Sequence, residues 1–117
     1  MFPNEEENTA ALVQRVDAFI QEHYTERITT KMLAQEFGLV PSYLSRLFRE
    51  YKGVTPNHYI QNIRIERSKE MLLNCPTVLT TDIALMVGYV DSSYFFKVFK
   101  KNTGVSPSEY RMRELSK

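Results

Sequence analysis

The sequence has few of the features that mark secreted, membrane or metal-binding proteins. Its one cysteine, Cys75, cannot form an internal disulfide, so we expect a reducing, cytoplasmic setting. No run of about 18 apolar residues is present, which predicts no membrane-spanning helix. The acidic stretch 1–7 has the wrong charge for a secretory signal. His23 and His58 have no partners at metal-ligand spacing, so we expect no metal and no cofactor.

Net charge is also nearly absent, at +1, but the average hides a division of charge along the chain. Residues 1–40 carry seven acidic and three basic side chains, and residues 41–117 carry seven acidic and twelve basic ones. A basic C-terminal two-thirds favours a polyanionic partner, with an ordinary mixed surface as the alternative.

What the sequence does have is helical periodicity throughout. Thr29, Ser106 and prolines 41, 56 and 107 mark helix starts, and each of the four glycines follows a predicted helix. The pattern predicts an all-α chain of about seven helices without strands. The expected ranges are 10–24, 30–37, 41–52, 56–74, 80–87, 92–102 and 107 onward.

An internal repeat of about 50 residues relates the two halves of the chain. Leu33-Ala34 matches Ile83-Ala84 at an offset of 50, and the offset becomes 51 after the following turn. The further matches are Ser42-Tyr43 with Ser93-Tyr94, Arg46 with Lys97, Phe48-Arg49 with Phe99-Lys100, and Gly53, Pro56 and Tyr59 with Gly104, Pro107 and Tyr110. Each copy is a short helix, a glycine turn and a second helix, which is typical of helix-turn-helix units. Two copies are too few for a helical solenoid.

The second helix of the first copy has two distinct faces. Leu44, Leu47, Phe48 and Tyr51 form one predicted buried stripe. The other stripe, which combines small polar groups with long cations, consists of Ser42, Ser45, Arg46 and Arg49. Small residues allow a helix into the major groove, and arginine can then reach guanine edges while serine meets phosphates. An ordinary solvated face is the alternative.

The second helix of the second copy repeats this arrangement. Phe95, Val98 and Phe99 face inward by spacing, and the outer stripe holds Ser93, Phe96, Lys97 and Lys100, with Lys101 beside it. Phe96 has two interpretations of equal weight. It contacts a thymine methyl group, or it packs on a neighbouring helix.

Three other functions compete with DNA binding. No paired-carboxylate, phosphate-loop or nucleophile motif appears, so we expect no catalysis. A protein-interaction domain would fit the modest net charge and the acidic first helix. Small-molecule sensing has no support, since no pattern predicts a ligand pocket.

Taken together, these residues resemble the DNA-binding domain of the AraC/XylS family of bacterial transcription regulators, over about residues 16–111. The resemblance also extends to the output domains that family members fuse to two-component receivers. The residues that carry it are Ile83-Ala84, Val87-Gly88-Tyr89, Asp91, Ser93-Tyr94-Phe95, Phe99-Lys100-Lys101, Gly104 and Ser106-Pro107-Ser108-Glu109-Tyr110-Arg111, with Leu33-Ala34, Tyr43-Leu44-Ser45-Arg46-Leu47-Phe48, Gly53 and Tyr59 in the first copy.

The resemblance implies two helix-turn-helix subdomains tied by a long helix, and activation through promoter DNA and RNA polymerase. It also implies a sensor or receiver domain that is absent here, so that the chain would be a fragment. By position, the expected DNA-facing residues are Ser42, Ser45, Arg46 and Arg49 in one helix, and Ser92, Ser93, Phe96 and Lys97 in the other. Lys100 and Lys101 match places where cations lie near phosphates.

Three positions depart from the family pattern. Val40-Pro41 replaces the usual polar cap, Phe96 stands where a small polar residue is common, and Ser68 stands where alanine is usual.

The expected organisation is a disordered or linker segment 1–9, a first subdomain 10–55, a linker helix 56–75 and a second subdomain 76–117. A helix over 56–74 would be about 28 Å long, against about 34 Å per turn of B-DNA. It can therefore hold two recognition helices in adjacent major-groove segments. Arg64 shares a face of this helix with Ile60 and Met71, so we expect a buried or half-buried structural arginine rather than a DNA contact.

Overall fold

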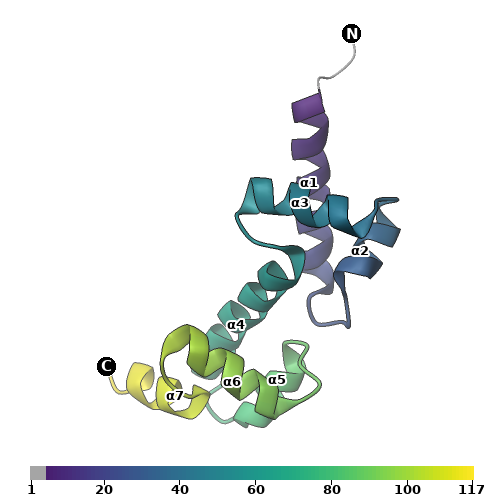
Figure 1. The fold of residues 1–117 in the computed structure, drawn as a ribbon. Helices are drawn as coiled ribbons and strands as arrows, with labels where there is room; N and C mark the ends of the chain where they lie inside the picture. Colours follow the sequence, from purple (N-terminus) through teal and green to yellow (C-terminus); the bar gives the residue numbers. More distant parts are fainter. Residues whose placement is uncertain (1–4) are drawn as a thin grey trace. The chain divides into compact units, whose positions relative to one another are not determined.

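The computed structural model describes residues 5–117, and all of its regular structure is helical (Figure 1). The seven helices are α1 (Glu5–His23), α2 (Thr30–Glu36), α3 (Pro41–Lys52), α4 (Pro56–Asn74), α5 (Thr80–Met86), α6 (Ser92–Thr103) and α7 (Pro107–Leu115). The chain divides into two units, one ending at Gln61 and one starting at Asn62, so α4 contributes residues to both. The all-α prediction is confirmed.

Local signals in the sequence set most helix ends. The Thr29 hydroxyl accepts a hydrogen bond from the N–H of Met32 (3.1 Å), and the Ser106 hydroxyl accepts one from Glu109 (3.2 Å). Pro41 opens α3 at a position where a missing N–H costs nothing. Gly53 ends the same helix with a φ of 79°, a left-handed conformation that glycine adopts without strain.

One helix start differs from the expected one by more than a residue. Helix α1 begins at Glu5 rather than near residue 10, because residues 5–9 contain no proline or glycine that would interrupt a helix. The expectation for residues 1–4 lies outside the described residues. Helix α5 begins at Thr80 as expected, and Leu79 before it provides no side-chain cap.

The first unit packs α3 against both α1 and α2 (Figure 1). Its core consists of Val13, Val16, Ile20, Leu33, Ala34, Leu44, Leu47, Phe48 and Ile60. Tyr51, predicted to continue the buried stripe of α3, is instead 43% exposed. It lies at the last turn of the helix, where its hydroxyl forms a hydrogen bond with Thr9 of α1 (2.6 Å).

The second unit packs α5 against α6 and α6 against α7, and it includes the later turns of α4. Its core consists of Ile65, Ser68, Leu72, Ile83, Ala84, Val87, Tyr89, Phe95, Val98 and Phe99. Ser68 is fully buried in this apolar set because its hydroxyl donates to the backbone oxygen of Ile65 (2.7 Å). A hydrogen bond of this kind offsets the cost of burying a hydroxyl group.

Candidate nucleic-acid interface

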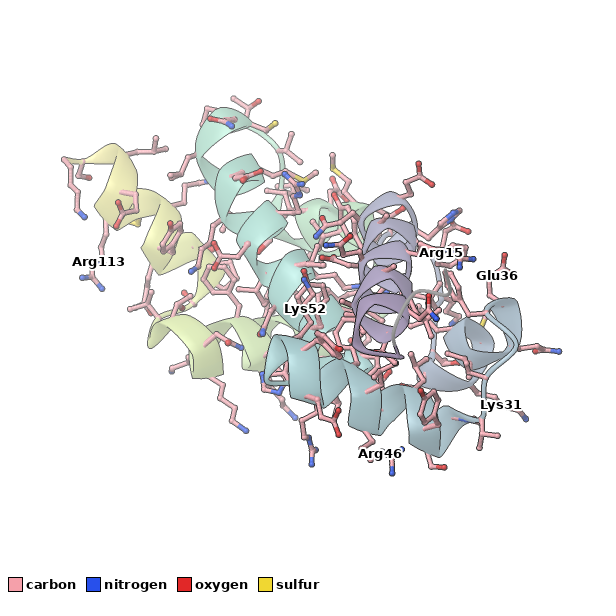
Figure 2. All side chains as sticks on the ribbon, turned by 90° about the horizontal axis from the view of Figure 1, so that it is seen from above. Arg15, Lys31, Glu36, Arg46, Lys52 and Arg113 are labelled. Carbon is pink, nitrogen blue, oxygen red and sulfur yellow. The ribbon has the colours of Figure 1, made fainter. Side chains whose placement is uncertain are left out.

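Helix α3 presents the predicted cationic stripe on the surface of the first unit. Ser42, Arg46 and Arg49 are exposed and Ser45 is half-buried, while the opposite face of the helix fills the core. Figure 2 shows the Arg46 side chain directed away from α3. Its guanidinium carbon lies 5.4 Å from the centre of the Tyr43 ring, a cation–π contact that orients the side chain.

Arg46 and Arg49 make no ion pair within the part of the chain that the structure describes. Cations without an acidic partner keep their full attraction for phosphate, because no internal pair must be broken first. The third cation of this helix is different. Lys52 donates to the Asp17 carboxylate (2.8 Å), so it is engaged inside the unit.

Helix α6 presents the corresponding stripe on the second unit. Ser93, Lys97, Lys100 and Lys101 are exposed and Ser92 is half-buried. The three lysines make no ion pair among residues 5–117. Both helix-turn-helix units therefore expose the predicted polar and cationic residues on their second helix, while their DNA contacts stay a prediction.

Phe96 is half-buried, with its ring centre 5.8 Å from that of Phe95. Phe95 belongs to the same helix, so this contact does not test whether Phe96 packs on a neighbouring one. The exposed part of the ring is what contact with a thymine methyl group requires, so both interpretations remain.

The starts of the two outer helices differ. The Asp91 carboxylate accepts a hydrogen bond from the N–H of Ser93 (2.9 Å) at the start of α6. Val40 precedes α3 and makes no such bond. Amide groups at the start of α3 consequently lack a side-chain acceptor, which a DNA phosphate could supply.

Arg64 has the structural place that its spacing predicts. It is half-buried, with its guanidinium carbon 5.5 Å from the centre of the Tyr89 ring. Burial lowers the pKa of Arg64 and raises the pKa of Tyr89 to about 12.

Two networks escaped the sequence analysis. Asp17, Lys52 and Tyr59 form one in the first unit, and Arg111 forms the other by donating to the backbone oxygens of Leu72 (2.9 Å) and Cys75 (3.1 Å). Periodicity carries no signal for partners that are 35 to 42 residues apart.

The described residues were also compared with the requirements of a metal site and of a membrane-spanning helix. Among residues 5–117, no group of three or more His, Cys, Asp or Glu side chains could bind a metal ion. No helix in the same range is both long enough and apolar enough to cross a membrane.

Comparison with known proteins points in one direction. A family model described as a helix-turn-helix domain matches residues 33–113. The C-terminal domain of AraT, a response regulator from Geobacillus stearothermophilus, is 35% identical and superposes with a TM-score of 0.83, covering 86% of this chain and 84% of that one.

Two curated relatives are longer than this chain. The uncharacterized HTH-type transcriptional regulator YijO of Escherichia coli is 38% identical over 101 residues, which are 86% of this chain and 35% of that protein. The bifunctional transcriptional activator and DNA repair enzyme AdaA of Bacillus subtilis is 33% identical over 114 residues, which are 97% of this chain and 53% of that protein. The chain thus spans about a third to a half of these relatives.

Proposed function

Because the chain belongs to the AraC-type family of helix-turn-helix DNA-binding domains, we propose that it binds double-stranded DNA sequence-specifically and regulates bacterial transcription. One observation carries the proposal. Each of the two units exposes polar and cationic side chains on its second helix at matching positions, and the cations proposed to contact DNA make no ion pair among residues 5–117. Small polar and cationic side chains on an exposed helix suit the major groove of DNA, and here the same pattern occurs in both units.

The proposed contacts are of two kinds, those to base edges and those to backbone phosphates. Arg46 and Arg49 of α3 reach base edges, where arginine forms a bidentate pair with guanine, and Ser42 and Ser45 let the backbone approach the groove. Ser92, Ser93, Phe96 and Lys97 form the reading surface of α6. Lys100 and Lys101 lie near phosphates, where they add affinity but no sequence preference.

On DNA, the two recognition helices would occupy adjacent segments of the major groove. Helix α4 has 19 residues and is therefore about 28 Å long, close to the roughly 34 Å of one duplex turn. A single chain would then contact two half-sites, a task that many regulators perform as dimers.

Selection of bound sites from a random duplex pool tests the proposal. We expect two conserved half-sites with centres about 10 base pairs apart, and binding that weakens steeply with salt. Recovery of no consensus, or binding that salt does not change, would contradict it.

We further propose a protein partner for regulation, with bacterial RNA polymerase in the cytoplasm as the target and activation as the outcome. The similarity to AdaA, a transcriptional activator, supports this, and the similarity to AraT, a response regulator, supports a separate sensor or receiver domain. One surface also supports it. Helix α5 exposes Leu85 and Met86 where α2 has Gln35 and Glu36.

The second copy can be given the polar surface of the first. We expect the double variant Leu85→Gln, Met86→Glu to bind DNA as the parent does and to lose activation in transcription with purified bacterial RNA polymerase. Full activation by that variant would contradict a contact through α5.

We propose no catalytic role. The family is one of DNA-binding regulators, and the DNA repair activity of AdaA belongs to a protein of which this chain matches 53%.

A further inference from the structure

In the first unit, a carboxylate closes the space between α1, the end of α3 and the start of α4. Asp17 accepts hydrogen bonds from the Lys52 ammonium (2.8 Å) and the Tyr59 hydroxyl (2.9 Å). The Lys52 nitrogen also lies 5.5 Å from the centre of the Tyr59 ring. Burial raises the pKa of Asp17, but the hydrogen bonds from Lys52, Tyr59 and Gln21 outweigh it, so the pKa lies below 3.8.

The internal repeat identifies the corresponding place in the second unit. The buried residues Val13, Val16 and Ile20 of α1 match the buried residues Ile65, Ser68 and Leu72 of α4 at an offset of 52. The same offset places Lys69 where the first unit has Asp17. At the offset of 51 that relates α3 to α6, Thr103 replaces Lys52, Val105 replaces Val54 and Tyr110 replaces Tyr59.

These counterparts surround a cavity. It has a volume of about 220 Å³ and is lined by Lys69, Thr103, Val105, Tyr110, Arg113 and Glu114. Three of the six lining residues, Lys69, Thr103 and Tyr110, are the counterparts of Asp17, Lys52 and Tyr59 in the closed arrangement of the first unit. Where the first unit supplies its own anion, the second unit has a cation and an open space.

We propose that this cavity binds a carboxylate group that takes the place Asp17 occupies in the first unit. The Lys69 ammonium and the Tyr110 hydroxyl are the donors, as Lys52 and Tyr59 are for Asp17, and Arg113 adds positive charge. Thr103 serves only as a wall, since its hydroxyl already contacts the backbone oxygens of Phe99 (2.8 Å) and Val105 (2.9 Å).

Two features define the ligand. The cavity is below the roughly 300 Å³ at which pockets for drug-sized ligands begin, so it suits a short acid or a single Asp or Glu side chain. The present partner of Lys69 is Glu66, an exposed carboxylate one turn away (2.9 Å), and such pairs are weak enough to exchange.

A DNA phosphate is a poor occupant, because none of the proposed DNA-contacting residues lines the cavity. The site is therefore independent of the proposed DNA interface, and its failure would leave that interface intact.

Titration with propionate, followed by amide chemical shifts, tests the site. At constant pH and ionic strength, we expect saturable shifts at Val105, Tyr110 and Arg113 that chloride and phosphate do not reproduce. Lys69→Met should weaken propionate binding at least about tenfold, since a charge-assisted hydrogen bond is lost. Equal shifts with chloride, or unchanged binding by Lys69→Met, would overturn the proposal.

A blocked tripeptide with central aspartate distinguishes the two sources of the carboxylate. If the peptide binds more tightly than propionate, or if only the peptide binds, the ligand is an acidic protein side chain. If propionate binds more tightly, or if only propionate binds, the ligand is a small acid. If neither binds above the chloride control, the proposal is wrong.

A second variant keeps the test valid if Lys69→Met fails to fold. Lys69→Asp with Thr103→Lys copies the first unit and supplies an internal carboxylate. We expect a higher melting temperature, no propionate shifts and DNA binding equal to that of the parent. Propionate binding as strong as in the parent would overturn the proposal.

Discussion

The Arg64 guanidinium lies over the ring of Tyr89, with its carbon 5.5 Å from the ring centre. The Tyr89 side chain is only 6% exposed, and its hydroxyl has no hydrogen-bond partner among the described residues. A buried unpaired hydroxyl costs free energy, whereas the ring contact with Arg64 does not need it. We therefore expect Tyr89→Phe to raise the free energy of unfolding by about 1 kcal/mol in urea denaturation at pH 7.

The free energy of unfolding measured at alkaline pH gives a second test of the burial of Tyr89. Burial raises the pKa of Tyr89 from 10 to about 12, so the folded state keeps the phenol proton more tightly than the unfolded state does. The corresponding stability is complete below pH 10 and is lost as the pH rises through 12, by at most about 3 kcal/mol. Tyr89→Phe should lose less stability over this interval. Identical pH profiles for the two proteins would contradict the assigned burial.

Capping of the two outer helices gives a second prediction. Asp91→Ala removes the hydrogen bond to the Ser93 amide and should destabilise the chain by about 1 kcal/mol. Val40→Ser adds a cap that α3 lacks and should stabilise by up to about 1 kcal/mol. Thermal unfolding measures both changes. Melting temperatures that shift in the same direction would show that capping does not limit these helices.

Helix boundaries and buried helix faces could be predicted because their signals lie close together in the sequence. Thr29, Pro41 and Gly53 act on their own helix, so the sequence around each is enough to place a boundary. The buried and exposed faces of α3 and α6 could be predicted because buried positions in a helix recur every three or four residues. The repeat added strength, since one pattern appears in two places.

What could not be predicted depends on partners remote in sequence. Lys52 continues the basic character of α3, yet its ammonium is held by Asp17, which is 35 residues away. Tyr51 has the spacing of a core residue but lies where the helix leaves the core. The cavity beside Lys69 was not predicted either. Its lining residues come from separate helices, and no local sequence pattern indicates how such residues pack together.

The Asp17 network gives a third prediction. Asp17→Asn should destabilise the chain by about 1 kcal/mol at pH 7, a modest value because both Asp17 and Lys52 keep some exposure. Since the pKa of Asp17 is lowered in the folded state, this stability is present above about pH 4 and is lost as the pH falls through the folded-state pKa. Denaturation of parent and variant at several pH values measures it, with Glu50→Gln as the exposed control. A difference that persists at low pH would contradict the network.

Base reading gives a fourth prediction. Arg46→Ala should weaken binding to a selected site by about 1–3 kcal/mol and relax the base preference at one position. The reason is that a bidentate contact discriminates among bases, and alanine removes it without disturbing the buried face of α3. Competition among site variants measures the preference, and Arg46→Lys provides a matched control that keeps the charge but not the fork. Unchanged preference in both variants would remove Arg46 from the reading surface.

Phosphate contact gives a fifth prediction, with the opposite signature. Lys100 is exposed on α6 and makes no ion pair among residues 5–117, so Lys100→Ala should weaken binding to specific and random duplexes alike and lower the salt slope by about 1. The slope falls because one fewer counterion is released from the DNA. Binding constants at several salt concentrations measure it, with Lys69→Met as a control that removes a cation elsewhere in the second unit. If Arg46→Ala and Lys100→Ala both bind a selected site as tightly as the parent, the faces assigned to α3 and α6 are wrong.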